Sequence, residues 1–193
     1  MSFSVEWTER DFQAKEAAEL SGVPQDLQRN WRRRGLLEEH GTTARVRFDL
    51  FHVCDLKVLG ILSEAKISVK FARFMGSQVA AEVMGHIRRN PAACEVIGAE
   101  LTAAEIERLA QECYGEPMRG RFTMFRMPDV PEGDPRTYCF VAATWDGLME
   151  MAARDGGVSA GLVLDSASIA REIVSAAKRP LITFRLTPKE AGE

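Results

Sequence analysis

Amide and guanidinium side chains recur at helical spacing between residues 24 and 34. A helix advances by ~100° per residue, and at that spacing one side of the stretch carries Gln25, Gln28, Arg29 and Arg32. Leu27 and Trp31 lie nearly opposite. Guanidinium groups bind phosphates, and both guanidinium and amide groups form hydrogen bonds with base edges. The stretch therefore predicts a helix that packs through Leu27 and Trp31 and offers its other face to nucleic acid.

A second helix and two turns would position this polar helix. Residues 13–20 are strong helix formers. Gly22 suits the left-handed conformation that a tight turn needs, and Pro24 suits the first turn of the helix that follows. Gly35 ends that helix. The pattern predicts two helices joined by a tight turn, with the polar one running from Pro24 to about residue 34.

Basic residues continue beyond the polar helix. Residues 45–48 alternate as a short strand would, which places Arg45 and Arg47 on the same side of a small wing. Between Gln28 and Phe48 there are six arginines against two acidic residues, although the whole chain has a net charge of −3. A local basic patch on a slightly acidic molecule fits a specific, salt-sensitive DNA-binding protein. An arginine-rich helix face that is merely solvated is the alternative.

Many spaced positions between residues 12 and 70 agree at once with one known domain. They are Ala18, Gly22, Val23, Arg29, Trp31, Gly35, Leu36, Leu37, the Arg45–Phe48 wing, Val53, Leu56, Ile67 and Ser68. With these residues the segment resembles the winged helix-turn-helix of the MerR family. Gln28 stands where that family usually has leucine, so we expect Leu27 to pack in its place. Asn30 replaces a common aromatic residue, and Arg32 a common acidic one.

The resemblance implies a transcription regulator that binds double-stranded DNA as a homodimer, at sites related by a dyad, with RNA polymerase as a further contact. The residues expected at the DNA are Lys15, Gln25, Gln28, Arg29, Arg32, Arg33, Arg45 and Arg47. Gln25 and Gln28 would face bases, the arginines of the helix would bind phosphates or bases, and the wing arginines would follow the backbone.

The sequence lacks the spacing of a catalytic or metal site. Its cysteines are Cys54, Cys94, Cys113 and Cys139, with neither a CxxC pair nor a histidine at ligand spacing. We therefore expect buried thiols rather than the metal or oxidant sensor that some MerR relatives contain. The glycine-rich residues 156–161 lack the lysine of a phosphate-binding loop. We expect no catalytic residue, no metal, no cofactor and no enzymatic activity.

Further helices are predicted after the wing. Asp49 can cap a helix over residues 50–65, and Ser68 begins one that runs to residue 89. In the latter, every fourth residue is apolar, namely Phe71, Met75, Val79, Val83 and Ile87. This stripe could be a dimer contact or ordinary core, and the pattern favours neither.

The residues between that helix and position 116 are predicted to be helical as well. The Asn90-Pro91 pair breaks the preceding helix, and residues 92–98 are interpreted as a short helical turn. Thr102 and Glu105 form a capping box that opens a helix to about residue 113.

The last third of the chain alternates strands and helices. Strands are predicted over residues 121–127, 137–143, 159–164 and 181–186, and helices over 145–154 and 167–178, the last capped by Asp165 or Ser166. The order indicates a small α/β domain. Its aromatic residues could line a ligand pocket, although core packing is the favoured interpretation: Phe122, Phe125, Tyr138, Phe140 and Trp145.

The expected fold class is α+β, in three parts. Residues 1–67 would be the winged helix-turn-helix, 68–116 a helical linker or dimerisation region, and 117–193 the α/β domain of unknown role. No apolar run reaches the ~18 to 20 residues of a membrane span, and the acidic start lacks a signal-peptide core. We expect a cytoplasmic protein with no membrane partner. Two alternatives remain: an architectural or excisionase-like DNA-binding protein of phage type, and a protein-interaction adaptor.

Overall fold

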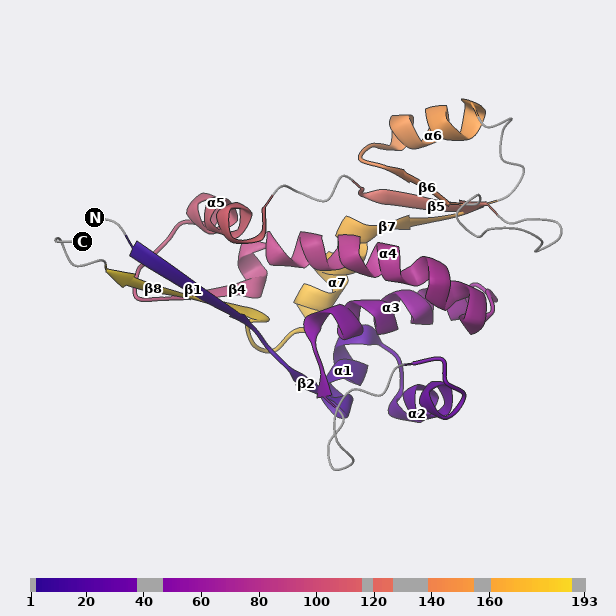
Figure 1. The fold of residues 1–193 in the computed structure, drawn as a ribbon, viewed down its shortest axis with the longest axis horizontal. Helices are drawn as coiled ribbons and strands as arrows, with labels where there is room; N and C mark the ends of the chain where they lie inside the picture. The colour runs from indigo at the N-terminus through magenta and orange to yellow at the C-terminus, as the bar shows by residue number, and fades with distance from the viewer. Residues whose placement is uncertain (1–2, 38–46, 116–119, 127–138, 155–160, 189–193) are drawn as a thin grey trace.

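A computed structural model describes residues 3–37, 47–115, 120–126, 139–154 and 161–188. The fold is α+β, as predicted, with helices packed in the middle and short sheets at their sides (Figure 1). One continuous hydrophobic core extends from Phe12 to Leu186 and includes side chains from both ends of the sequence. Within the described residues, no helix combines the length and the apolar character that crossing a bilayer would require.

The first two helices form the predicted pair. Helix α1 spans Ala14–Ser21 and α2 spans Gln25–Arg33. Gly22 takes the left-handed conformation, with φ of 76°, and its N–H donates to the carbonyl of Ala18 at 2.9 Å. Pro24 lies just before α2 rather than inside its first turn. Trp31 is 3% exposed and joins α2 to the core, as the sequence predicted.

A short ladder lies beside these helices. Strand β2 (Phe12–Gln13) pairs antiparallel with β3 (Arg47–Phe48), so that Phe12 is opposite Phe48 and both rings are buried. The strand predicted over residues 45–48 is therefore confirmed for its last two residues. Arg45 lies outside the described residues. This strand pairing holds the start of α1 next to the start of the helix that follows β3, at residue 50.

Two long helices form the centre of the molecule. Helix α3 spans Leu50–Glu64, and its cap is the predicted Asp49, whose side chain accepts from the N–H of His52 at 2.8 Å. Helix α4 spans Val69–Arg88 and is capped by Ser68. Val79, Val83 and Ile87 are fully buried within this single chain. This part of the apolar stripe is therefore core and cannot serve as a dimer contact without unfolding.

Strand β1 (Phe3–Glu9) was not predicted, and it joins the last strand of the chain. Strand β8 (Ile182–Pro188) lies between β1, which is antiparallel to it, and β4 (Cys94–Ile97), which is parallel. The short helical turn predicted over residues 92–98 was thus wrong for most of its length. Only Pro91–Ala93 forms a 3-10 turn, η1, and the chain then extends along β8.

Helix α5 (Ala103–Tyr114) packs against one face of this sheet, where Tyr114 meets β1 and β8. Its predicted capping box is present, with Thr102 and Glu105 each bonded to the other's backbone. The ring of Tyr114 lies 4.5 Å from that of Trp7 on β1. The guanidinium of Arg88 is 4.6 Å from the Tyr114 ring and bonds Glu9 at 2.6 Å. These contacts connect β1, α4 and α5.

A second sheet lies on the side of α4 that is opposite α3 (Figure 1). Strand β5 (Phe122–Arg126) lies between β6 (Cys139–Ala142) and β7 (Gly161–Asp165), both antiparallel to it. Helix α6 (Trp145–Arg154) covers its outer face through Leu148 and Ala152. The strands and helices here follow the predicted order, and Asp165 caps α7 (Ser166–Ala176) through the N–H groups of Ala167 and Ser168.

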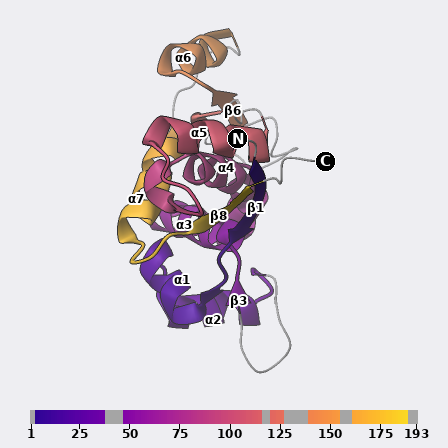
Figure 2. The ribbon, with the colours of Figure 1, turned by 90° about the vertical axis from the view of Figure 1, so that its left-hand side faces the viewer.

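The α/β domain predicted for residues 117–193 does not close on itself. Helix α7 leaves the β6–β5–β7 sheet and packs against α4 and α1, and β8 then joins β1 and β4. Figures 1 and 2 show α6 at one end of the molecule and α1, α2 and β3 at the other. The C-terminal segment therefore runs from one end of the fold back to its middle.

Candidate nucleic-acid interface

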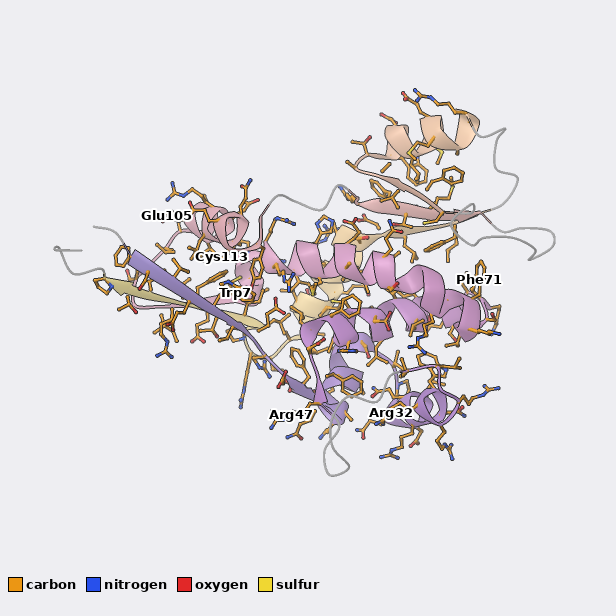
Figure 3. All side chains as sticks on the ribbon, viewed as in Figure 1. Trp7, Arg32, Arg47, Phe71, Glu105 and Cys113 are labelled. Carbon is orange, nitrogen blue, oxygen red and sulfur yellow. The ribbon has the colours of Figure 1, made fainter. Side chains whose placement is uncertain are left out.

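Helix α2 forms one end of the molecule, and its outward face is basic. Residues 25–34 contain four arginines, Arg29, Arg32, Arg33 and Arg34, against one carboxylate, Asp26. Arg29, Arg33 and Arg34 are exposed, and Arg32 is half-buried. In Figure 3, Arg32 and Arg47 lie along the same lower edge of the molecule. Guanidinium groups from α2 and β3 are thus available to one extended, negatively charged partner.

The prediction that Gln28 faces bases was wrong. Gln28 is 0% exposed, and its Nε2 donates to the carbonyl of Val23 at 2.8 Å. The turn before α2 leaves this carbonyl inside the protein, where a buried acceptor needs a donor, and the amide provides it. Leu27, which we expected to pack in its place, is 37% exposed. The helix is therefore rotated so that Gln28 and Trp31, not Leu27, form its inner face.

Asp26 and Arg29 lie together at the start of the outer face. Nη1 of Arg29 donates to Oδ1 of Asp26 at 2.8 Å, and both side chains are well exposed. With Arg32 and Arg33 they line an open depression of about 550 Å³. Nε of Arg32 is buried and has no hydrogen-bond partner in the part of the chain that the structure describes. The depression is a shallow basic surface rather than an enclosed pocket.

Lys15 lies on the neighbouring helix α1 and is exposed. It lines a second open depression of about 550 Å³, together with Gln25, Asp26 and Arg29. Glu19 lines the same depression, and Nζ of Lys178 donates to its Oε2 at 2.7 Å. This hydrogen bond lowers the pKa of Glu19, and the charge of Lys178 adds to the effect. Lys178 therefore offsets the Glu19 charge and Arg29 offsets that of Asp26, so that Lys15 gives this depression a net positive charge.

Strand β3 contributes one cation among the described residues. Arg47 on β3 is 65% exposed, and its Nη1 lies 3.6 Å from Oδ2 of Asp11. Such a long pair at the surface contributes little to stability, so that Arg47 can exchange Asp11 for a phosphate. The other predicted wing residue, Arg45, lies outside the described residues, as does His40.

The structure thus brings Lys15, Gln25, Arg29, Arg32, Arg33 and Arg47 to one end of the fold and removes Gln28 from the set. It adds three exposed residues that the predicted site omitted: Leu27 and Asn30 on α2, and Arg34 directly after it. Arg34 belongs to the same arginine run as Arg32 and Arg33 and could have been included on that ground. Leu27 and Asn30 could not, because their exposure follows from the rotation set by the buried Gln28.

The cysteines do not form a site. Among the described residues, no three His, Cys, Asp or Glu side chains are grouped so that they could hold a metal ion. Burial raises the pKa of Cys94 and of Cys139 to about 11, and burial also raises that of Cys54. Since the thiolate is the reactive form, these raised pKa values disfavour thiolate formation at neutral pH.

No family model matches the sequence, and no curated protein is similar enough to it to count as a match.

Proposed function

We propose that the protein is a transcription regulator of MerR type that binds specific double-stranded DNA through a winged helix-turn-helix. The observation that carries the proposal is the orientation of α2. Its inner face is fixed by Gln28 and Trp31, its outer face presents Arg29 and Arg33 to solvent, and Arg34 is exposed directly after its last turn. An α-helix with its side chains is roughly 10–12 Å across, which suits insertion into a major groove about 12 Å wide.

In this proposal α2 enters the major groove with its N-terminal half toward the bases. Gln25, Arg29 and the exposed Asn30 would read base edges, and Arg32, Arg33 and Lys15 would bind phosphates. Arg47 would follow the backbone from the wing. The protein would act as a homodimer in the cytoplasm, on half-sites about 34 Å apart, with RNA polymerase as a further contact and without a cofactor or enzymatic activity.

The rest of the chain limits where a homodimer contact could lie. Val79, Val83 and Ile87 of the α4 stripe are buried inside the monomer, so these three side chains cannot form that contact. Salt bridges join α1 to the residues just after α7, through Glu19 and Lys178 at 2.7 Å, and α3 to α7, through Lys57 and Glu172 at 2.8 Å. Helix α1 also packs against both α3 and α7, so the basic end is supported by two further helices.

The test is a binding titration on DNA selected by the protein itself from sheared genomic fragments. We expect sites with dyad symmetry near promoters. We also expect Arg29→Ala to lose roughly 1–3 kcal/mol of binding free energy at moderate salt. The matched control is Arg154→Ala, an exposed arginine of α6 at the opposite end of the molecule that forms a surface pair with Glu150, as Arg29 does with Asp26 (Figure 1). Equal binding by wild type and Arg29→Ala would contradict the proposal.

The same experiment separates the two alternatives. Selection of recombination attachment sites rather than promoters would favour an excisionase-like protein. An adaptor that has lost DNA binding would show no salt-dependent affinity for any fragment, whereas phosphate contacts make affinity fall steeply with salt.

A further inference from the structure

Strand β1 forms an edge of its sheet. The sheet has the order β1–β8–β4, so among the described residues β1 pairs with a strand on one side only. Figure 2 shows β1 at the border of the sheet, next to β8. The strand is seven residues long, and five of them are exposed, namely Phe3, Ser4, Glu6, Trp7 and Thr8. An exposed edge of this length can pair with a further strand.

The backbone groups of alternate residues in β1 are directed away from β8. Arg10, which follows β1 directly, donates its N–H to the carbonyl of Leu181 at 3.0 Å, and this bond closes the β1–β8 pairing. In an antiparallel pair, residues that exchange hydrogen bonds alternate with residues that do not. The even-numbered residues of β1 therefore bond β8. The N–H and C=O groups of the odd-numbered residues, from Phe3 to Glu9, are directed to the outer edge.

The usual protections of an edge are weak in β1. Natural edge strands are commonly short, or they contain lysine, proline or a bulge. Strand β1 contains neither lysine nor proline, and its pairing with β8 runs through seven consecutive residues without a bulge. Strand β4, at the other edge of the same sheet, has only four residues. Strand β1 rather than β4 is therefore suited to add a strand.

Two exposed rings indicate which strand fits this edge. Phe3 and Trp7 are 37% and 41% exposed, and because they are four residues apart in a strand they lie on the same face. A second copy of β1, running antiparallel, offers the same two rings in reverse order. With Val5 opposite Val5 of the partner subunit, Phe3 lies opposite Trp7 of the partner subunit. Aromatic side chains directly opposite each other stabilise antiparallel strands.

The charges of β1 are compatible with this register and oppose the neighbouring one. With Val5 at the centre, Glu6 lies opposite Ser4 of the partner subunit, and no two carboxylates face each other. A register centred on Glu6 would instead put the two Glu6 side chains opposite each other, where like charges are destabilising. A register centred on Trp7 would move Phe3 beyond the end of the partner strand.

We infer that β1 is the contact of the homodimer. Two copies pair antiparallel about a dyad beside Val5, so that two three-stranded sheets become one continuous sheet. The pairing is closed, because each copy uses its one β1 edge and leaves none for a third copy. This contact rests on the proposed function only for the homodimer itself, since the pairing needs no DNA.

The first experiment measures the mass of the full chain without DNA. Sedimentation equilibrium up to millimolar concentration should show a dimer, of twice 21.5 kDa, in exchange with the monomer. Val5→Pro should weaken the dimer at least about tenfold, because it removes a central N–H from both strands. Val5→Thr is the matched control, since it keeps the N–H and the branched Cβ. The Val5 N–H is not used by β8, so Val5→Pro should keep the circular dichroism of wild type.

A monomer at every concentration would overturn the inference, and so would a dimer that Val5→Pro leaves as tight as wild type. The DNA titration is read separately. A monomer that still bound its selected sites would remove the β1 contact and leave DNA binding standing. A dimer that Val5→Pro dissociates, but that bound no DNA, would support the contact and contradict the regulator.

A second set of variants tests the register. Opposite Glu6 of the partner subunit, Ser4→Lys should tighten the dimer by about fivefold and Ser4→Glu should weaken it by a similar factor, because the pair occurs twice. Both variants lose the 3.3 Å bond from Oγ of Ser4 to the Thr187 carbonyl, so their comparison isolates the charge. Thr8→Lys and Thr8→Glu are the matched controls, since Thr8 is exposed on the same face but lies beyond the paired residues 3–7. Equal effects of lysine and glutamate at position 4, or effects as large at position 8, would overturn the inference.

Discussion

The amide of Gln28 donates to a carbonyl inside the turn between α1 and α2, and this bond separates two glutamines that look alike in the sequence. Gln25 is half-buried on the outer side of the helix, whereas Gln28 is fully buried. Substitution by glutamate should therefore destabilise the fold at position 28. At position 25 it should leave the fold intact and weaken DNA binding.

We expect Gln28→Glu to reduce the free energy of unfolding by about 3 kcal/mol or more, because it buries a carboxylate and removes the donor to Val23. Gln25→Glu should leave that free energy nearly unchanged and weaken DNA binding. Urea unfolding followed by circular dichroism would measure the first effect, and a DNA titration the second. A stable Gln28→Glu that merely lost DNA affinity would show that Gln28 faces outward after all.

At the scale of elements, the caps of the helices carry the clearest sequence signal. Asp49 accepts from the N–H of His52, the third residue of α3, and from Nδ1 of the same residue. We expect Asp49→Ala to cost about 1 kcal/mol of stability, the usual effect of losing an N-cap. The measurement is the urea midpoint. Asp11→Ala is the control, since Asp11 makes a 3.6 Å surface pair with Arg47 and caps no helix. Equal losses in the two variants would rule out a specific capping effect.

A second prediction at this scale concerns pH. His86 and Glu82 lie one turn apart on α4, and both bond the backbone of Gly120 beside Arg89, Arg121 and Asp165. Burial lowers the pKa of His86 below its ordinary value of 6.5, and Arg89 adds to this. Burial raises the pKa of Glu82. Nε2 of His86 has no hydrogen-bond partner among the described residues, so a proton added there would be a buried, unpaired charge.

The unfolded chain takes up the His86 proton near pH 6.5 and the folded chain only at lower pH. In that window the unfolded state binds more protons, so stability falls as the pH falls. Glu82 acts in the opposite direction, because its raised pKa lets the folded chain bind a proton first. We expect His86→Gln, which keeps a donor for Gly120, to lose less thermal stability than wild type between pH 7 and pH 5.5. An identical loss in the two proteins would remove His86 as the cause.

Most elements could be predicted because their signals are local. Asp49, Ser68 and the Thr102–Glu105 box each mark a helix start within four residues. Strand β1 and strand β4 could not be predicted in the same way. Residues 3–9 alternate apolar and polar types but look like a free N-terminal tail until β8 is placed beside them. Residues 94–97 are too short to show a period, and their pairing with β8 is what extends them.

Only part of the candidate site could be predicted from the sequence. The arginines of α2 could be identified from spacing alone, because a charged face at helical period must be solvated. Which glutamine was buried depended on the Val23 carbonyl, a backbone group without a sequence signal. The outer edge of β1 also escaped the sequence, because it exists only once β8 pairs with residues 3–9.

At the scale of the whole molecule, β8 is the central strand of its sheet, with Phe184 and Ile182 fully buried. Amides of such a strand exchange only when the whole protein unfolds. We expect the amides of Ile182–Leu186 to exchange at the rate of global unfolding. Exchange should be faster in β6, because it is an edge strand and its side chains are only half-buried at Cys139, Phe140 and Val141. Mass spectrometry of exchange, with urea dependence, measures both. Slower exchange in β6 than in β8 would contradict this order.

The pairing of β1 with β8 also constrains how the chain is made. Residues 3–9 leave the ribosome early, yet their hydrogen-bonding partners at 182–188 are translated more than 170 residues later. Until then the nascent chain carries an open strand with the exposed rings of Phe3 and Trp7, a surface of the kind that chaperones shield. Premature termination at any codon ahead of 182 would therefore leave β1 without the strand that it pairs with.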